Sequence, residues 1–152
     1  MKDFRKSTEY QIYPKSFCDT NKDGLGDLRR VISRLDYIKE LGVDYIWLTP
    51  FFVSPQNDNG YDVADYYNID PGYGTMADVE ELIAEADKRG MGLMFDMVFN
   101  HVSTDHEWFQ KAMAGDPYYK DFFIFRKAKD NGEPPTNWES KFGGNAWEYV
   151  EK

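Results

Sequence analysis

The chain has 152 residues, of which 30% are charged and 17% aromatic, and its formal net charge is −9. Lys and Arg must neutralise the phosphates of nucleic acids and anionic membranes, so this acidic balance argues against both as partners. The single cysteine, Cys18, excludes an intrachain disulfide and favours a reducing, cytoplasmic location. Residues 1–6 carry no apolar run behind their charges, so no signal peptide is predicted. No window approaches the ~20 apolar residues of a membrane span.

The first predicted unit is a strand followed by a helix and a second strand. Residues 10–14 have the pattern of a short strand that ends at proline. After an acidic loop, apolar residues recur at helical spacing over 28–41, and Gly42 closes this helix. Residues 45–48 form a short continuous apolar run, which is typical of a buried parallel strand.

A second helix and a third strand follow a long polar loop at residues 54–74. Thr75 is a good N-cap, Asp78 stands three residues on in the capping-box position, and Gly90 caps the far end. Residues 93–99 are predominantly apolar and are predicted to form a third buried strand.

The order strand–helix–strand–helix–strand predicts parallel strands joined by helical crossovers. Both a doubly wound sheet and a (β/α)8 barrel begin in this way. The loops after the three strands are long, polar and aromatic, as at the C-terminal face of a barrel, where active sites lie. Three strands cannot close a barrel of about eight and would leave open sheet edges. We therefore expect the sequence to be the first part of a longer protein.

The pattern changes after Asn100. A short helix is expected over residues 106–114, and residues 118–126 are strongly aromatic. Prolines and glycines then mark an irregular segment over residues 134–144.

The acidic loop at residues 19–27 has the pattern of a metal site. Oxygen-bearing side chains alternate at Asp19, Asn21 and Asp23, and Gly24 permits a sharp bend. A further carboxylate follows at Asp27, and the carbonyl of Leu25 could supply another ligand. Calcium takes about six to eight oxygens, and carboxylates this close repel one another unless something neutralises them. The alternative is an acidic surface loop held by Asx-turns. The loop ends too soon for the glutamate at position twelve of an EF-hand.

Two further polar groups follow the second and third strands. In the loop after the second strand, Asp58 could accept hydrogen bonds from sugar hydroxyls, and Tyr61 could lie against a sugar ring. By pattern alone an ordinary Asn-Gly turn is the simpler interpretation. After the third apolar run, strand alternation would place Asp96 and Asn100 on one face, and His101 could donate to a sugar hydroxyl. A polar strand end is more often structural.

Together these motifs resemble one family, the α-amylase superfamily (glycoside hydrolase family 13). Within it they are similar to the branch of oligo-1,6-glucosidases, α-glucosidases and trehalose-6-phosphate hydrolases. The likeness runs from about residue 9 to the end of the chain. The segments that carry it are Tyr10–Pro14, Asp19–Asp27, Asp58–Asp62 and Asp96–His101.

The resemblance implies a (β/α)8 barrel in the complete protein. Residues 1–101 would be the N-terminal part of the barrel, and residues 102–152 would begin the small domain inserted after the third strand. Asp58, Tyr61 and His101 would line the subsite that holds the transferred glucosyl unit.

The resemblance also implies roles for the remaining polar groups. Asp96 and Asn100 would support the sugar pocket from the end of the third strand. The metal would be calcium or magnesium, because both take oxygen ligands. The residues implied as its ligands are Asp19, Asn21, Asp23, the Leu25 carbonyl and Asp27.

The activity implied is that of a retaining glycoside hydrolase acting on α-glucosidic bonds. In this family the nucleophilic aspartate and the acid/base glutamate come from later strands, so residues 1–152 alone are expected to be inactive. Residues 135–147 look most like trehalose-6-phosphate hydrolases, which predicts hydrolysis of trehalose 6-phosphate to glucose and glucose 6-phosphate. The acid-rich loop also resembles that of oligo-1,6-glucosidases. The alternative is therefore an oligo-1,6-glucosidase or an α-glucosidase. A non-catalytic sugar-binding remnant is an alternative of another class.

Overall fold

A computed structural model describes residues 3–150, which form two compact units that divide after His106. Residues 1–2 and 151–152, which the two predicted segments include, lie outside the described residues. None of the helices formed by residues 3–150 combines the length and the apolar character needed to cross a bilayer.

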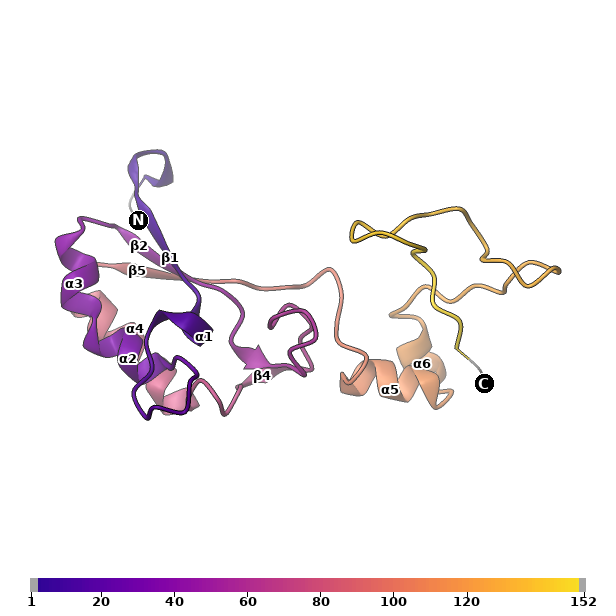
Figure 1. Ribbon diagram of the computed structural model, residues 1–152, viewed down its shortest axis with the longest axis horizontal. Coiled ribbons are helices and arrows are strands. Elements are labelled where there is room, and N and C mark those ends of the chain that lie inside the picture. Colours follow the sequence, from indigo (N-terminus) through magenta and orange to yellow (C-terminus); the bar gives the residue numbers. More distant parts are fainter. Residues whose placement is uncertain (1–2, 151–152) are drawn as a thin grey trace. The chain divides into compact units, whose positions relative to one another are not determined.

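A parallel sheet organises the first unit (Figure 1). Its strands, in spatial order, are β1 (Glu9–Ile12), β2 (Tyr45–Leu48) and β5 (Gly92–Phe95). The last residues of the three strands form one row, in which Ile12 pairs with Leu48 and Leu48 with Phe95. The predicted α/β fold with helical crossovers is confirmed, and the carboxyl ends of all three strands reach the same edge of the sheet.

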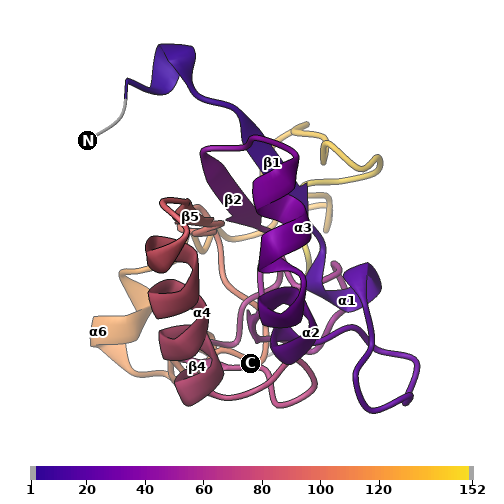
Figure 2. The same ribbon diagram turned by 90° about the vertical axis from the view of Figure 1, so that its left-hand side faces the viewer.

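Three helices cover one face of this sheet (Figures 1 and 2). They are α2 (Leu28–Ser33), α3 (Leu35–Glu40) and α4 (Met76–Lys88). The sequence predicts a single helix over 28–41, but the structure breaks it at Arg34, where ψ is 8°. At this break the Arg34 N–H donates to the carbonyl of Val31, three residues back rather than four. The apolar stripe continues across the break, because Leu35 and Ile38 are as fully buried as Val31.

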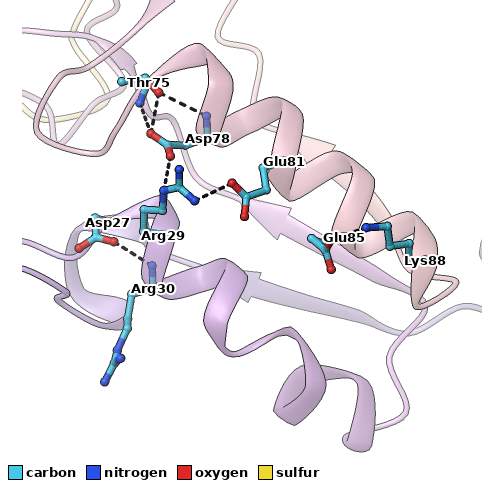
Figure 3. Close-up of polar contacts among 8 residues, drawn as sticks. All are labelled: Asp27, Arg29, Arg30, Thr75, Asp78, Glu81, Glu85 and Lys88. Atoms are coloured by element: carbon cyan, nitrogen blue, oxygen red, sulfur yellow. Dashed lines mark hydrogen bonds and ion pairs between the residues drawn. The ribbon is translucent and has the colours of Figure 1, made fainter.

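Helix α4 begins as the sequence predicts. The Thr75 hydroxyl accepts from the Asp78 N–H, while the Asp78 carboxylate accepts from the Thr75 N–H at 2.7 Å. Figure 3 shows that Arg29 of α2 also reaches this carboxylate, at 2.6 Å, and contacts Glu81 one turn further along at 2.5 Å. Since Asp78 is only 6% exposed, this ion pair fastens α2 to the first turns of α4.

The loops after β1 and β2 contain structure that the sequence does not predict. Residue 14 begins a short helix, α1 (Pro14–Phe17), after β1. Within the predicted polar loop, β4 (Asp65–Ile69) pairs antiparallel with β3 (Phe52–Val53), and the register shifts between Phe52 and Val53. A two-residue strand is too short to show an alternating pattern in the sequence.

The third strand is shorter than predicted and only half-buried. It ends at Phe95, not Phe99, so strand alternation does not place Asp96 and Asn100 on one face. If the observed register continued, Met97 would pair with Pro50. Proline has no N–H, so the hydrogen-bond ladder cannot continue there. The strand is half-buried because it lies at the edge of the three-stranded sheet.

The second unit begins with two short helices, α5 (Glu107–Met113) and α6 (Pro117–Lys120). Helix α5 matches the helix predicted over 106–114, whereas the sequence shows α6 only as part of an aromatic segment. Edge-to-face ring contacts join Trp108 to Phe122 and Phe109 to Phe123 at centroid distances of 5.4 and 5.2 Å. The remaining described residues are irregular, with one antiparallel bridge between Glu139 and Asn145.

One more short element precedes β1. The 3-10 helix η1 (Phe4–Lys6) starts at Asp3, whose carboxylate accepts from the Arg5 N–H. The Phe4 ring stacks on the Tyr45 ring at the start of β2, with centroids 4.9 Å apart.

Candidate functional site

The candidate site forms where the strands of the sheet end. Asp96 directly follows β5, and its N–H still donates to the carbonyl of Leu48 at the end of β2. This bond fixes the Asp96 backbone against the neighbouring strand. The loop after β2 therefore meets the segment after β5, although the two are more than 30 residues apart in sequence.

The first contact between these segments joins Tyr61 and Asp96. The Tyr61 hydroxyl donates to the Asp96 carboxylate at 3.1 Å. Burial raises the pKa of Tyr61 to about 12, with the hydrogen bond to Asp96 and the negative charges of Asp96 and Asp58 adding to the effect. The phenol therefore stays protonated at neutral pH and remains a donor.

The second contact involves both ring nitrogens of His101. Its Nε2 lies 3.0 Å from the carbonyl oxygen of Tyr61, and its Nδ1 lies 2.7 Å from the amide nitrogen of Asn100. A carbonyl can only accept, so Nε2 carries a hydrogen, and Nδ1 accepts from the Asn100 amide. The ring is thus held from both sides, with one edge towards the loop that carries Tyr61.

Asp58 lies in the same loop, but its side chain is exposed. Its carbonyl accepts from the Tyr61 N–H at 2.9 Å, so the two residues belong to one turn. The structure therefore groups all five sequence-predicted pocket residues, Asp58, Tyr61, Asp96, Asn100 and His101, at one edge of the first unit.

A residue that the sequence interpretation gives no role, Asp62, holds this turn. Its carboxylate accepts from the Ser54 hydroxyl at 2.8 Å and from the N–H groups of Asn57 and Asp58 at 2.9 and 3.1 Å. Partial burial alone raises the pKa of Asp62, but the hydrogen bond from Ser54 and those from the backbone outweigh it, so the pKa lies below its usual value. The repeated Asx residues at 57–62 were a signal of such a side-chain-capped turn.

Gly60 explains why the turn can approach the strand so closely. Its φ is +97°, and a Cβ at this position would lie 2.9 Å from the carbonyl oxygen of Pro50. Only glycine combines that conformation with that approach. Asn59 before it also has a positive φ, of 56°, which asparagine tolerates better than most residues.

The acidic loop after β1 is organised by its own carboxylates. Asp19 accepts from the N–H groups of Lys22 and Gly24 at 2.6 and 2.9 Å. Asp23 accepts from the Leu25 N–H and the Asn21 amide, each at 2.8 Å. The Leu25 and Asn21 bonds lower the pKa of Asp23, so it is ionised at neutral pH.

Asp27 closes the loop and starts the next helix. It accepts from the N–H and hydroxyl of Thr20 at 2.7 and 2.9 Å, and it caps α2 by accepting from the Arg30 N–H at 2.8 Å (Figure 3). The bend predicted at Gly24 is present, since its φ is +92°.

The donor chemistry of this loop fits a hard cation. Its five candidate ligands offer only oxygen, which calcium and magnesium both prefer. Within residues 3–150, no three His, Cys, Asp or Glu side chains gather closely enough to form a cage by themselves. The carboxylates and the Asn21 amide oxygen instead accept hydrogen bonds from the loop, including Asx-turns at Asn21 and Asp23.

The sequence is similar to one protein family and to glycoside hydrolases of known name. Residues 11–152 match the family described as "Alpha amylase, catalytic domain". Trehalose-6-phosphate hydrolase of Bacillus subtilis is 56% identical over 97% of this chain and 27% of its own length. Oligo-1,6-glucosidase of Parageobacillus thermoglucosidasius is 50% identical over 97% of this chain and 26% of its own length.

The fold of the chain also matches that of a solved structure. The crystal structure of Bacillus licheniformis trehalose-6-phosphate hydrolase superposes with a TM-score of 0.91 at 60% sequence identity. The match covers 95% of this chain and 26% of that chain. The chain therefore spans about a quarter of the length of these relatives.

Proposed function

Because the chain belongs to the α-amylase family, we propose that the complete protein is a retaining α-glucosidase whose substrate is trehalose 6-phosphate. Hydrolysis of that substrate yields glucose and glucose 6-phosphate. The observation that carries the proposal is the grouping of Asp58, Tyr61 and His101 by the contacts from Tyr61 to Asp96 and to His101.

Each grouped side chain suits one part of a glucosyl unit. The exposed Asp58 carboxylate accepts hydrogen bonds from sugar hydroxyls, and the half-buried Tyr61 ring offers an apolar face for the sugar. The exposed imidazole of His101 lies beside them, with both ring nitrogens bonded to Asn100 and to the Tyr61 carbonyl. Asp96 and Asn100 already bond to these groups, which assigns them to support of the pocket.

Neither Asp58 nor Asp96 is assigned to catalysis. A retaining glycosidase needs two carboxyl groups about 5–5.5 Å apart, one as nucleophile and one as acid/base. Asp96 already accepts from the Tyr61 phenol, and Asp58 is fixed in the turn with Tyr61. In the proposed function the two catalytic carboxylates come from the part of the protein that follows residues 1–152.

The choice of substrate rests on sequence similarity. Identity to the trehalose-6-phosphate hydrolases of Bacillus subtilis and Escherichia coli is 56% and 58%, against 50% to the Parageobacillus oligo-1,6-glucosidase. The second candidate is therefore an oligo-1,6-glucosidase, which would cleave isomaltose. We place the enzyme in the cytoplasm, in keeping with its single cysteine in this region.

One experiment separates these candidates. The purified full-length protein is assayed on trehalose 6-phosphate, trehalose and isomaltose at equal concentrations. We expect kcat/KM to be highest for trehalose 6-phosphate. Preference for isomaltose would support the second candidate, and sugar binding without hydrolysis of any of the three would support a non-catalytic remnant.

We also propose that the loop of residues 19–27 holds a structural calcium or magnesium ion. The ligands would be Asp19, Asn21, Asp23, the Leu25 carbonyl and Asp27. A cation there would neutralise the loop and stabilise the connection from β1 to α2, and no step of the reaction depends on it.

A further inference from the structure

Tyr66 lies behind the candidate site and has no part in the roles assigned above. It belongs to β4, and its hydroxyl oxygen lies within hydrogen-bonding distance of two backbone carbonyls. These are the carbonyl of Val98, at very short range, and the carbonyl of His101, at 3.0 Å. One phenol from the β3–β4 hairpin therefore contacts two carbonyls, three residues apart, in the segment that carries the candidate imidazole.

This segment needs an external donor. Residues 96–103 form neither helix nor strand, so regular secondary structure does not pair their carbonyls. An unpaired carbonyl at the buried Val98 would be costly, and the Tyr66 hydroxyl supplies a donor that lies between this carbonyl and that of the exposed His101. The hairpin also holds the end of the segment, because the Val63 carbonyl accepts from the Ser103 N–H at 2.8 Å.

The ring of Tyr66 is itself fixed by aromatic neighbours. Its centroid lies 6.3 Å from that of Phe52, 6.0 Å from that of Phe99 and 5.7 Å from that of His106. Phe52 and His106 are buried, so the phenol has little freedom to move. Burial also raises the pKa of Tyr66, which keeps its hydroxyl a donor at neutral pH.

We propose that Tyr66 is a positioning residue for His101: its hydroxyl is shared between the carbonyls of Val98 and His101 and thereby sets where the imidazole lies in the proposed sugar subsite. The proposal rests on the proposed function, since it is the subsite role of His101 that gives the position of the ring a consequence. The imidazole has two lateral partners, Asn100 and the Tyr61 carbonyl. Tyr66 adds a third restraint, on the backbone beneath the ring.

The test uses Tyr66→Phe in the full-length enzyme, a change that removes the hydroxyl and keeps the ring contacts. We expect kcat/KM on the best α-glucoside to fall about tenfold, the order of one lost hydrogen bond. The matched control is Tyr67→Phe, because the neighbouring tyrosine is 81% exposed. This control should leave kcat/KM within about twofold of the wild-type value.

A double-mutant cycle separates positioning of His101 from a general structural role. If Tyr66 acts through His101, then Tyr66→Phe should change kcat/KM less than about twofold in an enzyme that already carries His101→Ala. Hydrogen exchange should also rise at the amides of residues 98–101 in Tyr66→Phe and stay unchanged in Tyr67→Phe. Both results together support the proposal.

Three outcomes would overturn the proposal. A tenfold loss that persists unchanged in the His101→Ala enzyme means that Tyr66 acts elsewhere, and a Tyr66→Phe enzyme that does not fold means that the role is structural. An unchanged kcat/KM in Tyr66→Phe removes the role altogether. The activity of the wild-type enzyme is measured before that of any variant. If the wild-type enzyme hydrolyses no α-glucoside, the proposed function itself is wrong.

Discussion

The acidic loop and the predicted pocket residues are held together by contacts that span very different distances in the sequence. In the acidic loop the carboxylates of Asp19, Asp23 and Asp27 accept from residues two to seven positions away. The five predicted pocket residues, Asp58, Tyr61, Asp96, Asn100 and His101, are called the pocket cluster. In this cluster the contacts from Tyr61 to Asp96 and to His101 join residues 35 and 40 positions apart. The acidic loop is thus built mostly from its own sequence, whereas the pocket cluster exists only when β2 and β5 lie side by side.

Because of this difference, we expect substitutions in the acidic loop and in the pocket cluster to affect different properties of the protein. A change in the acidic loop should remain a local matter of stability, because its bonds return to the loop itself. A change in the pocket cluster should alter function, because Tyr61 and His101 there contact residues of another segment. The variants below test this contrast in the full-length protein, in order of decreasing effect.

Removal of the imidazole should have the largest effect. In His101→Ala we expect kcat/KM on the preferred substrate to fall by about 30- to 1000-fold, which corresponds to ~2–4 kcal/mol of lost transition-state binding. The kcat/KM of Asp58→Ala should fall in the same range, because its carboxylate belongs to the same proposed subsite. Steady-state kinetics measures both.

The control for these variants is Asp105→Asn, a change at an exposed carboxylate outside the cluster. Its kcat/KM should match that of the wild type. If the kcat/KM of His101→Ala equalled that of the wild type, the histidine would not belong to the subsite. The expected difference in activity between the acidic loop and the pocket cluster would then be wrong.

Loss of the charge that holds the turn should have the next largest effect. In Asp62→Asn we expect the free energy of unfolding to fall by ~1.5–3 kcal/mol at pH 7, since three hydrogen bonds to a carboxylate are weakened. Urea denaturation measures this value. The activity should also fall, because Asp58 and Tyr61 belong to the same turn.

The pH dependence of this difference has a definite sign. The folded-state pKa of Asp62 is lowered, so its contribution to stability is complete above the unfolded-state pKa of about 3.9. That contribution is lost as the pH falls through the lower folded-state pKa. The gap between wild type and Asp62→Asn should therefore be constant from pH 7 to about 5 and shrink below about pH 4. A gap that widens in acid would contradict the assigned cause.

The local loop and the long-range cluster also differ in how well the sequence predicts them. Capping of α4 by Thr75 and Asp78 follows from residue types three positions apart, and the structure confirms it. The bend at Gly24 likewise follows from local sequence. These features depend on backbone preferences and short-range hydrogen bonds, which a sequence displays directly.

Features that depend on the register of distant segments were not predictable in the same way. The third strand stops at Phe95 because the register with β2 would bring Met97 opposite Pro50, which has no N–H to continue the ladder. The β3–β4 hairpin was hidden in an apparently irregular loop, and with it the contact from Tyr66 to the His101 carbonyl. The residues of the predicted pocket were proposed from their motifs, but the bonds that join them in the structure could not be predicted.

The acidic loop offers a third prediction, on the proposed metal. Adding calcium to the metal-free full-length protein should raise its Tm, because a ligand that binds only the folded state adds ~2.7 kcal/mol at a concentration 100 times its Kd. In Asp23→Ala this increase should be largely lost. Differential scanning calorimetry with and without a chelator measures it, and Asp105→Asn again serves as control. An equal calcium response in Asp23→Ala would remove this residue from the ligand set.

The smallest effect is expected at Thr20, whose hydroxyl donates to Asp27 at 2.9 Å. Thr20→Val keeps the shape of the side chain and the backbone bond to Asp27 but removes this one donor. We expect the free energy of unfolding to fall by ~0.5–1.5 kcal/mol, the net contribution of one hydrogen bond, with kcat/KM unchanged. Urea denaturation and kinetics on the same preparation give both values. A fall in kcat/KM as large as that in Asp62→Asn would mean that the acidic loop is coupled to the sugar pocket, and that its hydrogen bonds do not keep their effect within the loop.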